Sequence, residues 1–396
     1  MIKTKMVDIN VKNDYQGYFS TSIEQKGPNL LLIQEIFGVN NHIKSVADTY
    51  AKQGYNVLAP DLFYKLKPGF TCGYSQDDMS EAFKLYSQFD IDSGVADLQE
   101  AVNYLKNLPT SNGKIAVLGF CLGGTMSYRL ACQSNDIDAA VSYYGGGIEN
   151  YLDLGKNIKC PIIFHYGSLD KHIPLSSVNK VENLIKDKNA CKVYIYNADH
   201  GFNCDERGSY NKISAQVAFE RSLTFLQQII GPDYDLNSIW EDHTQYEFTN
   251  FDVEATLATM TPDAIVNHVP TLTGGLGLDE LKNFYTKHFI KHMPSDTKIN
   301  VLNRTITSHR IIDEMIFSFT HDSVIDFMLP NVKPTGKYVE IAMVAVVTFE
   351  GDKIAIENVY WDQASVLLQL GLIEASKLPV AGSISAQKRI YKNFKS

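Results

Sequence analysis

The order of apolar and polar residues divides the chain into two parts. From the N-terminus to about residue 230, short apolar runs alternate with amphipathic segments of helical length. The runs are NLLLIQE, YNVLAPD, KIAVLGF, AAVSYYGG, CPIIFHYG and CKVYIYNAD. Near-continuous apolar strands separated by helices are typical of a parallel sheet that helices cover on both faces. The first part is therefore predicted to be an α/β domain with a mostly parallel, doubly wound sheet.

The predicted helices of the first part lie between these runs and end with a long closing helix. They are HIKSVADTYAKQG, MSEAFKLYSQF, SGVADLQEAVNYLKNL, the segment after Cys121, VNKVENLIKDK and YNKISAQVAFERSLTFLQQII. Gly231 and Pro232 follow directly, and this dipeptide with its polar neighbours is typical of a loop between domains. We expect the first domain to span residues 1–232.

The second part begins with two amphipathic helical stretches, around IWEDHTQYEFTNF and LDELKNFYTKHFIKHM. Long alternating runs follow: TKINVLNRTITS, RIIDEMIFSFTHDSVIDFMLP and KYVEIAMVAVVTFEGDKIAIENVYW. This order predicts a smaller α+β domain over residues 236–375 with an antiparallel, curved sheet. Gly351 and Asp352 predict a tight hairpin in the last run. Residues 376–396 are expected to form a basic, only partly ordered tail.

Composition narrows the classes of function. The chain has 396 residues and a net charge of −9, and its lysines are scattered, which argues against nucleic acid as the main partner. No apolar run approaches the about 18 residues of a membrane span, and the N-terminal MIKTKMVDINVKND has no signal-peptide core. We therefore expect a cytoplasmic protein without a membrane partner. The 6 cysteines lack the paired spacing of a zinc site or a disulfide framework.

The segment GFCLGG, residues 119–124, has the layout of a nucleophile elbow between a strand and a helix. Side chains at Gly119 and Gly123 would collide with the tight turn and the neighbouring strand, so glycine is expected there. The turn places Cys121 at a helix N-terminus, which favours a thiolate over a thiol. The N–H group of Leu122 would then point to where an oxyanion forms.

A nucleophile elbow predicts an acid and a histidine later in the chain, in that order. Asp170 follows the run IIFHYGSL, and His200 lies in the loop DHGF after KVYIYNAD. The histidine would take the thiol proton, while Asp170 would fix the tautomer of its ring. Asp199 is adjacent to His200 and cannot easily reach its ring. His165 lies within an apolar strand and is interpreted as a satisfied core histidine.

Residues from about 25 to 230 resemble the dienelactone hydrolase family of α/β-hydrolases. The resemblance rests on GFCLGG, on GSLD with DHGF, and on QEIFGVN after the first buried strand. It implies a Cys-Asp-His triad, with Glu35 near the resting cysteine and helping to form the thiolate. It also implies that the backbone N–H of Ile36 contributes to the oxyanion hole. The expected substrate pocket consists of Phe37, Tyr144, Phe202 and Arg207.

The sequence departs from the family pattern at the substrate. In the best-known members two arginines bind the substrate carboxylate, and an ungapped alignment places Met79 and Cys204 at these positions. Arg207 lies near the second position and could replace that arginine, but nothing obvious replaces the first. A dienelactone is therefore not the expected substrate, although the hydrolase chemistry is kept.

Residues from about 236 to 372 resemble the SnoaL-like polyketide cyclase family, a cone-shaped α+β fold of the nuclear-transport-factor-two-like type. The resemblance rests on VNHVPTLTGG, FYTKHFI, IDFMLPNVKPTGKYVEI and ENVYWDQASVLLQLGL. It implies a cone-shaped cavity and a homodimer formed through this domain. Of the residues that could converge there, His268 and Glu357 are the preferred candidates; the others are Asp313, Glu314, Asp326, Tyr360 and Trp361. Strand alternation allows only one carboxylate of the Asp313 and Glu314 pair to point inward.

These features together predict a cysteine hydrolase of a small ester or lactone that needs no metal or cofactor. Two readings of other classes stay open. One is a non-catalytic protein that binds a small ligand or senses redox state through an exposed Cys121 thiol. The other is a bifunctional enzyme whose second domain acts as a cyclase or isomerase.

Overall fold

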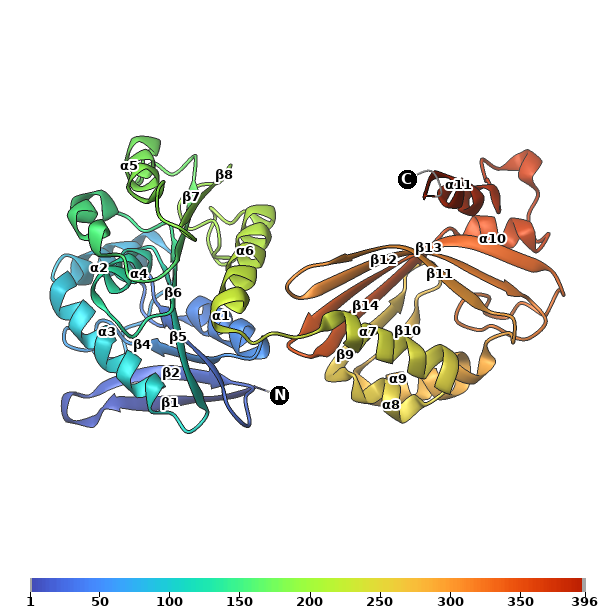
Figure 1. Ribbon diagram of the computed structural model, residues 1–396, viewed down its shortest axis with the longest axis horizontal. Coiled ribbons are helices and arrows are strands. Elements are labelled where there is room, and N and C mark those ends of the chain that lie inside the picture. Colours follow the sequence, from blue (N-terminus) through green and yellow to red (C-terminus); the bar gives the residue numbers. More distant parts are fainter. Residues whose placement is uncertain (1, 394–396) are drawn as a thin grey trace. The chain divides into compact units, whose positions relative to one another are not determined.

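The computed structural model describes residues 2–393 and divides the chain into two compact units, Met1–Asp233 and Tyr234–Ser396 (Figure 1). Each unit has its own core of buried apolar side chains. None of the helices in the described range is long and apolar enough to cross a membrane.

The N-terminal unit is built on one eight-stranded sheet with the order β1-β2-β4-β3-β5-β6-β7-β8. The strands from β3 to β8 pair in parallel, and β2 is antiparallel to both β1 and β4. All six predicted runs are strands. The bounds are β1 (Lys3–Asn10), β2 (Tyr15–Thr21), β3 (Gly27–Ile33), β4 (Asn56–Pro60), β5 (Ser111–Phe120), β6 (Ala139–Tyr143), β7 (Ile162–Gly167) and β8 (Lys192–Tyr196).

The hairpin β1–β2 was not predicted from the sequence. Only Val7 of β1 is buried, because this strand lies at the edge of the sheet and most of its side chains face solvent. An edge strand of this kind lacks the continuous apolar run by which the central strands are recognised.

Of the α-helices in this unit, α1 and α6 cover one face of the sheet and α3, α4 and α5 the other (Figure 1). Side chains cap several of them; Asn40 accepts a hydrogen bond from the N–H of Ile43, and Ser75 and Asp78 form a capping box. The bounds are α1 (Asn41–Lys52), α2 (Gln76–Tyr86), α3 (Ile91–Lys106), α4 (Leu122–Gln133), α5 (Leu175–Ile185) and α6 (Lys212–Ile230), with 3₁₀ segments η1 (Val11–Asn13) and η2 (Ile148–Asn157).

The C-terminal unit has a six-stranded sheet with the order β10-β9-β14-β13-β12-β11. Its strands are β9 (Met260–His268), β10 (Thr273–Leu276), β11 (Lys298–Ile306), β12 (Arg310–Thr320), β13 (Tyr338–Glu350) and β14 (Lys353–Trp361). The expectation of an antiparallel sheet needs one correction, because β9 pairs with β14 in parallel. The predicted hairpin is present: β13 and β14 are antiparallel, and Gly351 has a φ of 60°.

Helices lie on both sides of this second sheet, α7 to α9 on one side and α10 and α11 on the other (Figure 1). Two five-residue π-helical segments, η3 and η4, continue α7 and α9. The bounds are α7 (Leu236–Gln245), η3 (Tyr246–Asn250), α8 (Val253–Ala258), α9 (Gly277–Phe284), η4 (Tyr285–Phe289), η5 (Ile290–His292), α10 (Gln363–Gln369), η6 (Ala375–Lys377) and α11 (Ile384–Asn393). The predicted C-terminal tail thus contains a helix, and its residues 394–396 lie outside the described range.

Because each unit buries its own core, we predict that fragments 1–232 and 235–396 fold separately. Each fragment should show native-like circular dichroism and a single cooperative urea transition. Loss of cooperative unfolding in fragment 1–232 would show that its core depends on the second unit.

The same fragments test the expected homodimer. If the C-terminal unit forms the interface, light scattering should give a dimer for the full chain and for fragment 235–396, and a monomer for fragment 1–232. A monomeric full chain would contradict the expectation.

Candidate active site

The turn from β5 into α4 leaves no room for side chains at two glycines. A Cβ atom on Gly119 would lie 2.1 Å from the carbonyl oxygen of Gly123, and one on Gly123 would lie 2.3 Å from that of Ile33 in β3. Between them Cys121 has φ 53° and ψ −113°. A non-glycine residue in this region costs about 1–3 kcal/mol and is held only by strong surrounding structure. The collision expected from the sequence at both glycines is therefore present, and it forces the sulfur above the sheet edge.

His200 and Asp170 come from the loops that follow β8 and β7. The Nδ1 atom of His200 lies 2.7 Å from Oδ2 of Asp170. The other carboxylate oxygen, Oδ1, accepts hydrogen bonds from the N–H groups of His172 at 2.8 Å and Ile173 at 3.1 Å. The Asp170 side chain is fully buried, so these bonds hold it in one orientation. Because Nδ1 contacts Asp170, Nε2 is the ring nitrogen that can interact with other groups.

The environment of His200 favours its protonated form. Burial lowers the pKa of the ring, but the charge of Cys121 and the hydrogen bonds to Asp170 and Cys121 outweigh it and raise the pKa to about 10. The pKa of Asp170 is lowered despite its burial, because His200 and two backbone N–H groups stabilise the carboxylate. Asp170 and Cys121 thus act on the same histidine ring and together favour its protonated form.

A cavity of about 190 Å³ lies over Cys121. Cys121, Leu122 and His200 line it, and so do Ile36, Phe37 and Arg207. Leu122 is the first residue of α4, so its N–H has no partner within the helix and is available to a ligand. Met79, which the sequence analysis placed near the substrate, also lines the cavity. The other lining residues were not singled out from the sequence; they are Phe83, Tyr86, Gly146, Gly147, His172 and Ile173.

Tyr144 and Phe202 lie behind the cavity wall. Both are completely buried, and neither belongs to the lining. The ring of Tyr144 contacts those of His200 and Phe202, at centroid distances of 5.0 Å and 5.5 Å. They therefore support the histidine from behind, whereas the sequence had suggested that they form the pocket surface.

Glu35 is almost completely buried and forms an ion pair with Arg207. Its Oε1 lies 3.2 Å from Nη1 of Arg207, and Oε2 accepts a hydrogen bond of 3.5 Å from the hydroxyl of Tyr74. The guanidinium also lies over the rings of Phe37 and Tyr74. Both carboxylate oxygens of Glu35 therefore have partners other than Cys121. The two residues are separated by 172 positions in the sequence, which explains why the sequence did not reveal this pair.

Two other residues from the sequence analysis are buried away from the cavity. Cys204 is completely buried, so it cannot contribute to substrate binding in place of an arginine. His165 contacts the hydroxyl groups of Tyr196 at 2.7 Å and Ser222 at 3.0 Å. Burial lowers the pKa of His165 to about 3, so it is a neutral core histidine, as predicted.

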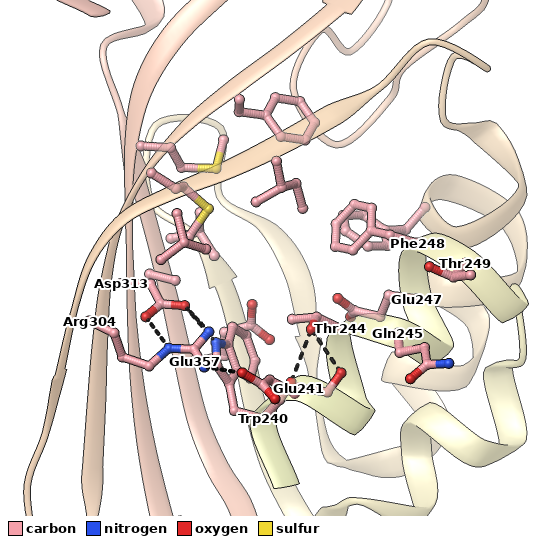
Figure 2. A pocket seen from close by; sticks show the side chains of 18 of the residues that line it. Trp240, Glu241, Thr244, Gln245, Glu247, Phe248, Thr249, Arg304, Asp313 and Glu357 are labelled. Atoms are coloured by element: carbon pink, nitrogen blue, oxygen red, sulfur yellow. Dashed lines mark hydrogen bonds and ion pairs between the residues drawn. The ribbon is translucent and has the colours of Figure 1, made fainter. Parts of the chain in front are cut away.

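The C-terminal unit contains a second and larger cavity, of about 520 Å³ (Figure 2). Its base is polar: Nε of Arg304 lies 2.7 Å from Oδ1 of Asp313, and Nε1 of Trp240 donates to Oδ2 of Asp313 at 2.9 Å. Much of the remaining lining is apolar and consists of Phe248, Phe289, Ile299, Val301, Met315, Phe317, Phe327, Met343, Ala345 and Val359.

Both preferred candidates of the second domain, His268 and Glu357, line this cavity. His268 is surrounded by the rings of Phe284, Phe289, Phe327 and Trp361, and burial lowers its pKa to about 4. Burial and the negative charge of Glu247 raise the pKa of Glu357 to about 8, although His243 opposes this. His268 is thus a neutral part of an aromatic wall, whereas Glu357 belongs to a cluster of ionisable side chains.

The remaining candidates lie in different places. Asp313 lines the cavity and is almost fully buried, and Glu314, which follows it on β12, is not part of the lining. Asp326 contacts His288 at a neighbouring surface hollow, Tyr360 is exposed, and Trp361 donates a hydrogen bond to Gln363. Sequence reasoning missed His243 and Glu247; their spacing of four residues on one helical face was the available signal.

Comparisons with known proteins concern the hydrolase-like half of the chain. The carboxymethylenebutenolidase of Pseudomonas putida is 35% identical over 202 residues, which cover 50% of this chain and 85% of that protein. The carboxymethylenebutenolidase of Pseudomonas knackmussii gives the same values. A family model described as the dienelactone hydrolase family matches residues 15–230.

Solved structures agree with this assignment. A protein from Klebsiella pneumoniae subsp. pneumoniae is 26% identical with a TM-score of 0.52, over 58% of this chain and 99% of that chain. A dienelactone hydrolase-like promiscuous phosphotriesterase from metagenomic libraries, 21% identical with a TM-score of 0.51 over the same shares of the two chains, shows the common fold alone. With an α/β-hydrolase sheet and a family match over more than half of its residues, this chain belongs to the dienelactone hydrolase family.

Proposed function

We propose that the N-terminal unit cleaves ester or lactone bonds through a covalent thioester on Cys121, with His200 and Asp170 completing a catalytic triad. Family membership makes the protein a hydrolase of this bond class. The observation that carries the finer proposal is the 2.7 Å contact between His200 and Asp170 beside a cysteine in a strained strand-to-helix turn.

Acylation begins with the resting pair of a Cys121 thiolate and a His200 imidazolium. The sulfur attacks the carbonyl carbon, and the electron pair of the C=O bond moves to oxygen. The N–H groups of Leu122 and Ile36 stabilise this oxyanion. When the intermediate collapses, the C–O bond to the leaving alkoxide breaks, and His200 gives its Nε2 proton to that oxygen. The enzyme is left as a thioester beside a neutral imidazole.

Deacylation uses the same groups in reverse. Neutral His200 takes a proton from water, and the hydroxide attacks the thioester carbonyl. The second tetrahedral intermediate collapses by expelling the Cys121 thiolate, which releases the carboxylic acid. Asp170 stabilises the imidazolium in both steps and keeps Nε2 facing the substrate. The cycle ends with the starting ion pair restored, so no metal or cofactor takes part in this mechanism.

The triad favours this proposal over the alternative of a non-catalytic thiol protein. A redox sensor needs a reactive cysteine but no oriented general base. Here the base is fixed by a buried carboxylate, and the lining of one cavity includes the cysteine, the histidine and the two residues whose N–H groups bind the oxyanion. Each of these features serves turnover of a bound acyl group.

We propose that the substrate acyl group is uncharged. Arg207 is the cation that the sequence offered for a substrate carboxylate, and its charge is already matched by the buried Glu35. Met79 lines the cavity where the resemblance expects another arginine. The nearby side chains of Phe37, Phe83 and Tyr86 provide an apolar surface instead.

We further propose that the C-terminal unit is a SnoaL-like cone domain. The support is its curved six-stranded sheet with helices α7 to α9 on one side, together with the large cavity whose lining comes from α7, η3 and the sheet (Figure 2). This architecture serves many activities, so the fold alone does not assign one.

Replacing the nucleophile should abolish turnover. We predict that Cys121→Ala loses at least about 10³-fold in kcat/KM on a chromogenic short-chain ester, as expected for removal of a covalent nucleophile. Mass spectrometry of rapidly quenched wild-type enzyme should show one acyl group on the peptide that contains Cys121.

The matched control is Cys132→Ala, because Cys132 lies on the same helix, α4, and is buried in the core. This variant should keep the turnover of the wild type within about threefold, and circular dichroism should show that removal of the buried thiol leaves the helix folded. Undiminished turnover in folded Cys121→Ala would refute the nucleophile.

The ion pair between Glu35 and Arg207 predicts a change in substrate preference. In the wild type, a free carboxylate on the acyl group should change kcat/KM by less than about tenfold, because one good charged hydrogen bond is worth roughly 1.5–3 kcal/mol and Arg207 is already paired. In Glu35→Gln the guanidinium is released, and carboxylated esters should gain relative to neutral ones.

The control for this prediction is Glu35→Gln combined with Arg207→Met, which should abolish the gained preference. The comparison uses the ratio of kcat/KM for a carboxylated and a neutral ester, so a general loss of activity cancels. A wild type that strongly prefers carboxylated substrates would contradict the proposal of an uncharged acyl group.

A further inference from the structure

Three ionisable side chains meet beside the cavity of about 520 Å³ in the C-terminal unit. His243 comes from α7, Glu247 from the π-helical segment η3, and Glu357 from β14. All three are at least nine-tenths buried. Figure 2 shows Glu357 on the sheet side and Glu247 on the helical side of the cavity. The hydrolase mechanism uses none of them.

The donor atoms of the cluster converge on one point. Nε2 of His243 lies 3.2 Å from Oε1 of Glu247 and 3.8 Å from Oε2 of Glu357. One donor atom from each of the three residues lies within 4.8 Å of the other two. The spacing of His243 and Glu247 by four residues puts both on one helical face, where β14 brings the second carboxylate to them.

The tautomer of His243 is set by its other nitrogen. Nδ1 lies 2.6 Å from the hydroxyl oxygen of Thr259, whose own hydrogen is donated to the carbonyl oxygen of Thr256 at 2.7 Å. The hydroxyl must therefore accept, and Nδ1 must carry the hydrogen. The neutral ring then presents the lone pair of Nε2 to the carboxylates. Metal-binding histidines are usually oriented in this way: the ring nitrogen that does not bind the metal donates a hydrogen bond to another group.

Two atoms of the cluster have no hydrogen-bond partner. Among the described residues, neither Nε2 of His243 nor Oε2 of Glu357 makes a hydrogen bond, although both are shielded from solvent. Arg304, the cation that lines the same cavity, is held by Asp313 and Glu241. In the described part of the chain, no arginine or lysine pairs with Glu247 or Glu357, and His243 alone faces both carboxylates. Burying two carboxylates beside one imidazole carries a desolvation cost, which a bound cation would offset.

The distances fit a metal ion better than an organic ammonium group. Ligands about 2.1 Å from a cation lie about 3.0 Å apart in octahedral and about 3.4 Å apart in tetrahedral geometry. Acceptors about 2.8 Å from an ammonium nitrogen lie roughly 4.6 Å apart. The 3.2 Å between Nε2 of His243 and Oε1 of Glu247 lies between these two metal values. The 3.8 Å between Nε2 of His243 and Oε2 of Glu357 reaches the tetrahedral value after a shift of Glu357 by about 0.4 Å.

We propose that His243, Glu247 and Glu357 bind a divalent transition-metal cation of the zinc, manganese or iron class. One imidazole and two carboxylates form a ligand set that suits these ions. Glu247 and Glu357 line the cavity, so the coordination positions that the protein leaves open face its interior. A metal there would coordinate an oxygen atom of a small molecule that enters the cavity. The site is independent of the proposed triad, which lies in the other unit.

The test measures metal binding by the full-length protein after treatment with a chelator and removal of that chelator. It uses the variant Asp205→Asn as background, because His42, Cys204 and Asp205 form a second cluster that can hold a metal. Titration with Co²⁺, followed by visible absorption and equilibrium dialysis, should give one tightly bound ion per chain. Zn²⁺ should displace it.

The substitutions Glu247→Gln and Glu357→Gln should each weaken Co²⁺ binding by at least about hundredfold, because a charged ligand is lost. The matched control is Glu241→Gln, which removes an exposed carboxylate from α7 and should leave the affinity unchanged within about threefold. His243→Gln provides a further variant should either glutamine variant misfold.

A second readout separates a metal site from a structural ion-pair network. In the metal-free protein, either glutamine substitution should leave the melting temperature unchanged or raise it, because one of the two buried carboxylates and its desolvation cost are removed. Metal should raise the melting temperature of the parent protein but not that of the variants. The proposal is overturned by failure of the parent protein to bind Co²⁺ and Zn²⁺, or by equal binding in folded variants. Hydrolysis by the N-terminal unit should be unaffected by either outcome.

Discussion

The close approach of β5, α4 and β3 at Gly119 and Gly123 is the constraint on which the hydrolase site depends. Because no side chain fits at either glycine, the chain turns sharply, and Cys121 takes a backbone conformation that a free peptide would avoid. The parallel sheet then brings the loops after β7 and β8 to the same edge, and these loops carry Asp170 and His200. The chemistry thus follows from packing: the turn fixes the sulfur, and the sheet order fixes its partners.

Buried charge is handled differently in the two units. In the N-terminal unit, Asp170 is matched by His200 and Glu35 by Arg207, and one member of each pair, His200 and Arg207, lines the small cavity that contains Cys121. In the C-terminal unit, Arg304 matches Asp313 in the same way, but Glu247 and Glu357 share the single imidazole of His243 and pair with no arginine or lysine among the described residues. Two buried carboxylates beside one imidazole are costly, which is why we propose a bound cation there.

Much of this arrangement could be predicted from the sequence because its signals are local. The six apolar runs became the strands β3 to β8, and GFCLGG became the turn with the expected collisions. What escaped prediction depends on distant contacts. Glu35 and Arg207 meet only after the sheet forms, and the pairing of β9 with β14 in parallel joins segments about 90 residues apart. The exposed hairpin strand β1 lacks the apolar pattern, and the π-helical segment at Glu247 has no sequence signature of its own.

The central claim is that the resting site holds a Cys121 thiolate beside a protonated His200, and alkylation measures it directly. The rate of iodoacetamide labelling at Cys121 should be compared between wild type and His200→Gln across pH. Because the pKa of His200 is raised to about 10, the imidazolium persists at neutral pH, and the wild-type rate should be nearly constant from about pH 6 to 9. In His200→Gln the rate should rise about tenfold per pH unit until near the pKa of an ordinary thiol, about 8.5. Superimposable profiles, both rising like that of an ordinary thiol, would contradict the account.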